Sequence, residues 1–134
     1  MIHVTFKIYN LTFTFMSYLL NNWSDESSLE LQAIRSGFGQ GIYEAGEKDE
    51  RIMLLNADLP GSLKVTKFSQ SFPDRYLQVG VAEQNMAGIA AGLSRAGKVP
   101  FISSFAAFSP ALNFSQIRLA AMSHFNYKVV ASHY

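Results

Sequence analysis

The sequence contains no cysteine, one tryptophan and four prolines in 134 residues. The absence of cysteine excludes disulfide bonds, thiolate metal sites and catalysis by a cysteine nucleophile. The three histidines stand at positions 3, 124 and 133, too far apart in the chain to show the spacing of metal ligands. Neither sign of charge dominates, because 11 Lys and Arg stand against 10 Asp and Glu. We therefore expect no metal site within the chain and no binding to nucleic acid.

The sequence also lacks a long apolar run. Residues 1–20 are rich in aromatic and β-branched side chains, but their apolar part is too short to span a membrane. This segment carries one lysine and no small-residue cleavage site, so it does not match a secretory signal peptide. We predict a cytoplasmic protein with no membrane partner. We interpret residues 1–20 as an N-terminal extension, either an added strand or upstream sequence, and residues 21–134 as one domain.

Apolar runs and helix-like segments alternate along that domain. The runs predict strands over residues 51–57, 76–79, 99–103 and 127–132. Helical periodicity and capping residues predict helices over residues 25–46, 62–71, 82–95 and 110–123. The alternation predicts an α/β fold with a doubly wound, mostly parallel sheet and helices on both faces. Because neither a loop nor a helix follows the fourth strand, we expect the domain to be truncated at its C-terminal end.

One acidic residue stands in a strongly apolar segment. Glu83 opens a helix made largely of Ala, Gly, Ile and Leu. Gly88 and Gly92 lie four residues apart, so they share one helix face and would let another backbone approach closely. A helix with so little polar surface is expected to be buried or to pack on a partner. Its glutamate is either a partner of the helix N-terminus or a group held for chemistry.

Other polar and aromatic side chains directly follow the predicted strands. Asp58 follows the first strand, Glu83 the second, Phe105 and Phe108 the third, and His133 the fourth. Ligands of open parallel sheets bind beyond the carboxyl ends of the strands. We therefore expect these side chains at one edge of the sheet. Each alone also has a structural explanation, such as a turn cap, a core ring or a chain end.

The same segments resemble the pyrimidine-binding domain of transketolases over residues 30–134. The segments that carry the resemblance read DLPGS, FPDRYLQVGVAEQNMAGIAAGL, GKVPFISSFAAF, QIR and KVVASH. The resemblance is strongest to the split, C-terminal transketolase subunits of bacteria and archaea. The 1-deoxyxylulose-phosphate synthases and the beta subunits of 2-oxo-acid dehydrogenases share the glutamate, so they remain alternatives.

This resemblance implies a site for thiamine diphosphate. In similar enzymes the glutamate that matches Glu83 hydrogen-bonds N1′ of the aminopyrimidine and favours the tautomer that removes the proton from thiazolium C2. Glu83 is therefore the implied catalytic residue. Phe105 and Phe108 match aromatic residues that line the aminopyrimidine pocket, and Asp58 matches an acid that contacts the cofactor.

The resemblance also implies a substrate and a partner. Arg35, Ser62 and His133 match groups that hold a sugar phosphate, and arginine is well suited to phosphate. No motif for Mg²⁺ and diphosphate occurs in the sequence, so a diphosphate-binding transketolase domain or subunit is expected to hold them in a homo- or hetero-oligomer. Residues 109–112, SPAL, depart from the family pattern of Gly-Arg or an aromatic residue, which weakens one wall of the expected pocket.

We therefore predict part of a thiamine-diphosphate-dependent transketolase, which transfers a two-carbon ketol unit between sugar phosphates. The isolated chain is expected to be inactive. The alternatives are a fragment of a 1-deoxyxylulose-phosphate synthase, a fragment of the 2-oxo-acid dehydrogenase beta type, and a non-catalytic interaction module. Such a module would keep the sheet and the small-residue helix for assembly.

Overall fold

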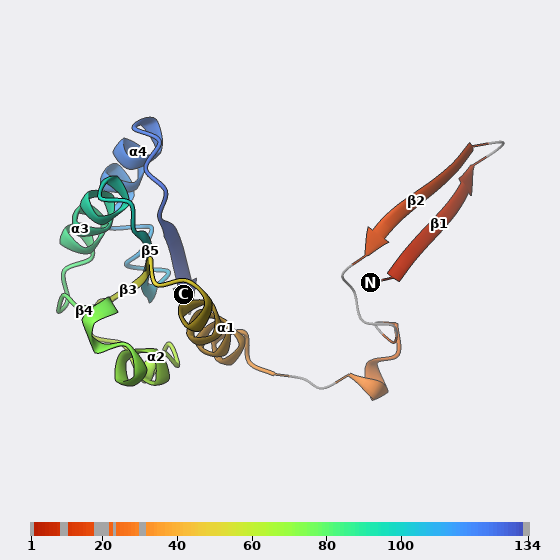
Figure 1. Cartoon of the computed structure of the whole chain (residues 1–134), viewed down its shortest axis with the longest axis horizontal. Coiled ribbons are helices and arrows are strands. Elements are labelled where there is room, and N and C mark those ends of the chain that lie inside the picture. The colour runs from red at the N-terminus through yellow and green to blue at the C-terminus, as the bar shows by residue number, and fades with distance from the viewer. Residues whose placement is uncertain (1, 9–10, 18–21, 23, 30–31, 133–134) are drawn as a thin grey trace. The chain divides into compact units, whose positions relative to one another are not determined.

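The computed structural model describes residues 2–8, 11–17, 22, 24–29 and 32–132 (Figure 1). The chain divides into two compact units, Met1–Gln32 and Ala33–Tyr134. In the first unit, β1 (Ile2–Ile8) pairs in antiparallel register with β2 (Leu11–Ser17). The sequence shows an alternation of apolar and polar residues over both segments, as a strand pair requires.

The helix predicted over residues 25–46 was wrong in its first part. The Asp25 side chain accepts a hydrogen bond from the Ser27 N–H, but it begins only the 3₁₀ turn η1 (Glu26–Ser28). The next residue, Leu29, is already extended. The long helix α1 begins at Ile34 and continues past Gly46 to Lys48. Local capping therefore predicted a helix start that the chain uses for a single turn.

The second unit is built on a parallel sheet. Its strands are β3 (Ile52–Asn56), β4 (Tyr76–Gln78), β5 (Val99–Phe105) and β6 (Lys128–Ser132). They lie in the order β4-β3-β5-β6, and every neighbouring pair is parallel. The predicted α/β fold with a parallel sheet is confirmed.

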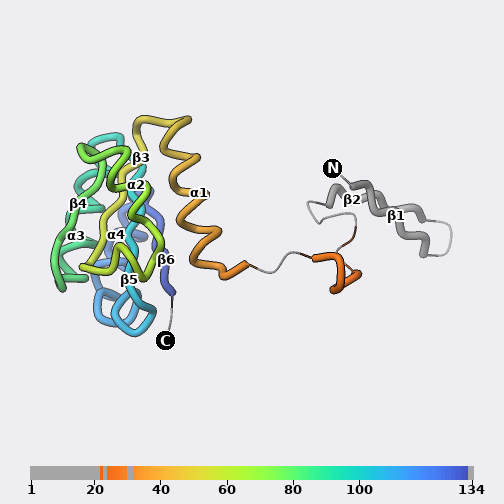
Figure 2. Tube along the Cα trace, turned by 90° about the horizontal axis from the view of Figure 1, so that it is seen from below, coloured from red at the N-terminus to blue at the C-terminus, as the bar shows by residue number. Residues whose placement is uncertain are grey.

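Helices cover both faces of this sheet. Leu54 of β3 packs with Ile42 of α1 (Ile34–Lys48) and Phe68 of α2 (Thr66–Ser71). The next residue, Leu55, packs instead with Met86 of α3 (Glu83–Arg95). Successive residues of a strand point to opposite faces, so α1 and α3 lie on opposite sides of β3 (Figure 2).

The last helix, α4 (Phe114–Met122), begins four residues later than predicted. Residues 106–113 form turns instead, in which the Phe108 N–H donates to the Phe105 carbonyl and the Leu112 N–H donates to the Phe108 carbonyl. In the part of the chain that the structure describes, no helix has the length and apolar character needed to cross a membrane.

Candidate functional site

The carboxyl ends of three strands meet at one edge of the sheet. Asn56 at the end of β3 is in register with Gln78 of β4 and with Ser103 of β5. Asp58 follows β3, Glu83 begins the helix after β4, and Phe105 ends β5. The structure therefore places these predicted site residues at the edge where ligands of parallel sheets bind.

Glu83 is a buried carboxylate at the first turn of α3, with 5% of its surface exposed. The Ser104 hydroxyl donates to Oε1 over 3.0 Å. Among the described residues, no donor reaches Oε2. Removing a carboxylate from water is costly unless hydrogen bonds and nearby partial charges compensate. The helix N-terminus and Ser104 supply part of that compensation, and Oε2 can accept a hydrogen bond from a ligand.

A cavity of about 420 Å³ lies beside this carboxylate. Its size is within the range of small-molecule pockets. Glu83 is the only acid among its lining residues, which are Val81, Ala82, Glu83, Gln84, Asn85 and Leu112. Glu83 therefore presents an ionisable group to a cavity that can receive a small polar ring.

Phe105 and Phe108 form a stacked pair at the end of β5. Their ring centroids lie 6.3 Å apart with an interplanar angle of 26°. The turn between them is closed by the N–H groups of Phe108 and Ser109, which both donate to the Phe105 carbonyl. Phe108 is 39% exposed, so its ring offers an apolar surface to a flat ligand.

Asp58 is exposed at the end of β3, and its backbone has a positive φ of 60°. Its N–H donates to Gln78 Oε1 over 2.7 Å, and the same oxygen accepts from the Gly80 N–H over 3.1 Å. Gln78 therefore joins the ends of β3 and β4. Burial, followed by the charge of Asp58, raises the pKa of the Tyr76 phenol.

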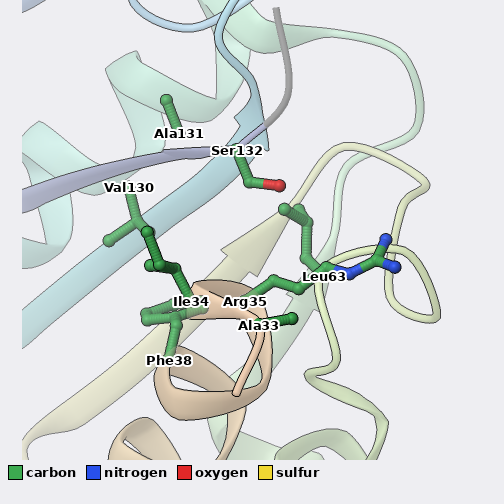
Figure 3. A pocket seen from close by; sticks show the side chains of 8 residues that line it. All are labelled: Ala33, Ile34, Arg35, Phe38, Leu63, Val130, Ala131 and Ser132. Carbon is green, nitrogen blue, oxygen red and sulfur yellow. The ribbon is translucent and has the colours of Figure 1, made fainter. Parts of the chain in front are cut away.

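A second cavity, of about 380 Å³, lies between the first turn of α1 and the end of β6. Figure 3 shows Arg35 extending from α1 toward the loop that carries Leu63. There Arg35 Nη1 donates to the Ser62 carbonyl over 3.5 Å. The lining residues are Ala33, Ile34, Arg35, Phe38, Leu63, Val130, Ala131 and Ser132.

The structure therefore brings together Arg35 and Ser62, two of the three predicted substrate residues. The third, His133, lies outside the described residues, although its neighbour Ser132 lines the same cavity. No group of three or more His, Cys, Asp or Glu within metal-binding reach occurs in the described ranges.

Sequence reasoning missed two buried polar residues near Glu83. Ser104 holds the carboxylate, and Asn113 Nδ2 donates to the Glu83 carbonyl over 3.2 Å. The pair of serines at 103 and 104 within an apolar strand was a detectable signal, because a buried hydroxyl needs a partner. Asn113 gave no such signal, because it lies inside the helix predicted over residues 110–123, and the sequence does not show which face of that segment is buried.

Comparison with known proteins places these features in a family. The family described as "Transketolase, pyrimidine binding domain" matches residues 30–134. A Methanocaldococcus jannaschii protein named for the C-terminal section of a transketolase is 44% identical over 103 residues, which are 76% of this chain and 33% of that protein. The 6-deoxy-6-sulfo-D-fructose transketolase subunit of Clostridium sp. strain MSTE9 is 43% identical over 108 residues, 80% of this chain and 34% of that subunit.

A solved structure gives the same result. A split-gene transketolase, described as an inactive beta4 tetramer, superimposes with a TM-score of 0.67 at 41% identity. The match covers 74% of this chain and 33% of that one. The chain thus spans about a third of the length of the relatives it matches.

Proposed function

This chain belongs to the transketolase family through its pyrimidine-binding domain, and on that premise we propose that it supplies the aminopyrimidine half of a thiamine diphosphate site. The observation that carries the proposal is the buried Glu83 carboxylate, with Ser104 on Oε1 and a cavity at its side. A protonated ring nitrogen of the aminopyrimidine would find in Oε2 an acceptor that no described residue uses. The Phe105–Phe108 pair supplies an apolar surface for the flat ring.

The residues of this chain have distinct parts in the proposed reaction. Thiamine diphosphate, when bound, supplies the electron sink for transfer of a two-carbon ketol unit. Glu83 would share a proton at Oε2 with a ring nitrogen of the bound pyrimidine, while the Ser104 hydroxyl fixes the orientation of the carboxylate. The exposed ring of Phe108 would exclude water from one side of the pyrimidine, and Asp58 would contact the cofactor from the end of β3.

We further propose an anionic sugar as the substrate. Arg35 lines the cavity beside β6, and a guanidinium binds the oxygens of phosphate through paired, charge-assisted hydrogen bonds. Ser62 and His133 complete the proposed set. A sulfonate offers similar oxygens, and one relative is named for a sulfo-sugar, so the substrate assay should include both kinds of anion.

The proposed partner is a chain that binds Mg²⁺ and the diphosphate. Two findings support an assembly of this kind: one relative is named for the C-terminal section of a transketolase, and one solved structure is described as a split-gene transketolase. The working enzyme is then an oligomer in which the cofactor lies between the two kinds of chain.

The Glu83→Gln variant tests the proposed function. In the assembly with a diphosphate-binding transketolase section, we expect ketol transfer at saturating cofactor to fall by about 10²- to 10⁴-fold, because the amide cannot exchange a proton. The control is Glu50→Gln, which makes the same change at an exposed acid that precedes β3, at the opposite end of this strand from Asp58. Near-normal turnover by a folded Glu83→Gln variant would contradict the proposal.

A further inference from the structure

Residues 109–112, the segment that departs from the family pattern, lie against α3 and are joined to it by hydrogen bonds. The segment continues into Asn113, which directly precedes α4. Gln84 Nε2 donates to the Leu112 carbonyl over 3.1 Å, and Asn113 Nδ2 donates to the Glu83 carbonyl over 3.2 Å. Two consecutive residues of the segment are thus hydrogen-bonded to two consecutive residues of the first turn of α3.

Of these two hydrogen bonds, the one between Asn113 and Glu83 is buried. Asn113 is fully buried, as is Ser109, and its Nδ2 donates to Ser109 Oγ over 3.0 Å as well as to Glu83. Both donors of the amide are therefore used. A buried hydrogen bond of this kind is costly to lose, because the partner left behind stays out of water.

The Asn113 side chain does not cap the helix that follows it. This residue occupies the N-cap position of α4, where asparagine normally accepts a hydrogen bond from the backbone of the first turn. Here the side chain makes no such bond, and Oδ1 has no partner among the described residues. The amide is directed at α3 instead of at its own helix.

The segment connects this amide to the aromatic pair. The Leu112 N–H donates to the Phe108 carbonyl, and Ser109, which accepts from Asn113, is the residue after Phe108. We infer that Asn113 is a positioning residue, which sets the place of the Phe108 ring relative to the Glu83 carboxylate. The inference rests on the proposed function, since it is the aminopyrimidine that would contact both groups.

The Asn113→Ser variant separates positioning from helix capping. Serine is a good N-cap, so α4 should be retained, but its short side chain does not reach the Glu83 carbonyl. In the assembly with a diphosphate-binding section, titrated with thiamine diphosphate and Mg²⁺, we expect the cofactor Kd to rise by about fivefold to 150-fold, the range for a lost buried partner. The control is Asn126→Ser, which changes an exposed asparagine between α4 and β6.

A double-mutant cycle with Phe108→Leu gives the result that a merely structural role would not. We expect Phe108→Leu alone to raise the cofactor Kd by about fivefold or more, the scale of lost stacking on a flat ring. In the Asn113→Ser background it should add less than about twofold, because the ring is already displaced. In the Asn126→Ser background the full effect of Phe108→Leu should remain.

Independent effects of Asn113→Ser and Phe108→Leu, or a cofactor Kd unchanged by Asn113→Ser, would overturn the inference. If Asn113→Ser does not fold, Gln84→Met removes the exposed connection to Leu112 and is placed in the same cycle. Failure of the proposed function looks different: the unmodified assembly would not bind thiamine diphosphate, or Glu83→Gln would retain turnover. The inference alone fails when binding and the Glu83 effect are present and the cycle shows no coupling.

Discussion

Two adjacent serines of β5 serve opposite faces of the sheet. Ser104 Oγ donates to Glu83 on the α3 face. Ser103 Oγ accepts from Asn56 Nδ2 over 3.0 Å and donates to the Leu55 carbonyl over 3.3 Å. Both serines are fully buried, so removing either hydroxyl leaves a buried group without its partner. The two residues thus form a matched pair in burial and chemistry but not in proposed role.

The substitutions Ser104→Ala and Ser103→Ala exploit this match. We expect each to lower the free energy of unfolding by about 1–3 kcal/mol. Only Ser104→Ala should also weaken thiamine diphosphate binding and slow ketol transfer, because only Ser104 holds the Glu83 carboxylate. Urea unfolding and cofactor titration measure the two effects. Equal losses of cofactor affinity in both variants would show that the serines act through general stability.

Tyr76 gives a prediction at alkaline pH. Burial, with the charge of Asp58 second, raises the pKa of its phenol, and the hydroxyl has no partner among the described residues. The pKa of this phenol is higher in the folded chain than in the unfolded chain. The contribution of the protonated phenol to the free energy of unfolding is therefore fully present below about pH 10, and it is lost as the pH rises through the folded-state pKa. Tyr76→Phe should therefore be neutral or slightly stabilising near pH 8 and should reduce the alkaline loss.

Unfolding free energies of Tyr76→Phe and the unmodified chain, measured near pH 8 and above pH 10, test this prediction. Tyr127 has a phenol whose pKa is also raised by burial, so part of the alkaline loss should remain in the variant. An alkaline loss identical in the two proteins would show that the Tyr76 phenol does not titrate in the folded state as argued.

At the scale of elements, α3 has one buried and one open face. Met86, Ala87 and Ala90 pack on the sheet and are fully buried. Gly88 and Gly92, expected to admit another backbone, are exposed, and an added Cβ at either would meet nothing within 4 Å. Within the described residues no other backbone approaches these glycines, and packing of this face on a partner stays a prediction. The close approaches occur in α1, at Gly39 and Gly46.

The contrast between Gly88 and Gly39 is testable, because both lie inside helices. Gly88→Ala should raise the free energy of unfolding by up to about 1 kcal/mol, since alanine is the better helix former and its methyl group has space. Gly39→Ala gains the same propensity but places a Cβ 2.1 Å from the Lys64 carbonyl oxygen, so it should destabilise the chain. Destabilisation by Gly88→Ala in the purified chain would show that this face is packed.

Over the whole molecule, the fold was predictable because the buried strands are short apolar runs. The apolar run IMLLN predicted that β3 is buried on both faces. The run of small residues after Glu83 likewise predicted the helix α3. Helix boundaries were less predictable: Asp25 and Pro110 resemble start signals, but Leu29 is extended and the turns after Phe105 postpone α4. These outcomes depend on tertiary contacts that local sequence does not contain.

The candidate site was likewise predictable only in part from the sequence. Position after a strand placed Asp58, Glu83 and Phe105 at one edge, because that edge follows from topology alone. Ser104 and Asn113 could not be assigned to Glu83 from sequence. Their bonds to it join residues 21 and 30 positions apart, and which partners meet depends on the packing of α3 against β5 and the 106–113 turns.

The central claim is that this chain carries the aminopyrimidine half of a thiamine diphosphate site and needs a diphosphate-binding half to complete it. Calorimetric titration with thiamine diphosphate and Mg²⁺, performed on this chain, on a transketolase diphosphate-binding section and on their mixture, tests it most directly. We expect saturable, stoichiometric binding by the mixture and weak or no binding by this chain alone. Tight, stoichiometric binding by this chain alone, or no binding by the mixture, would contradict the account.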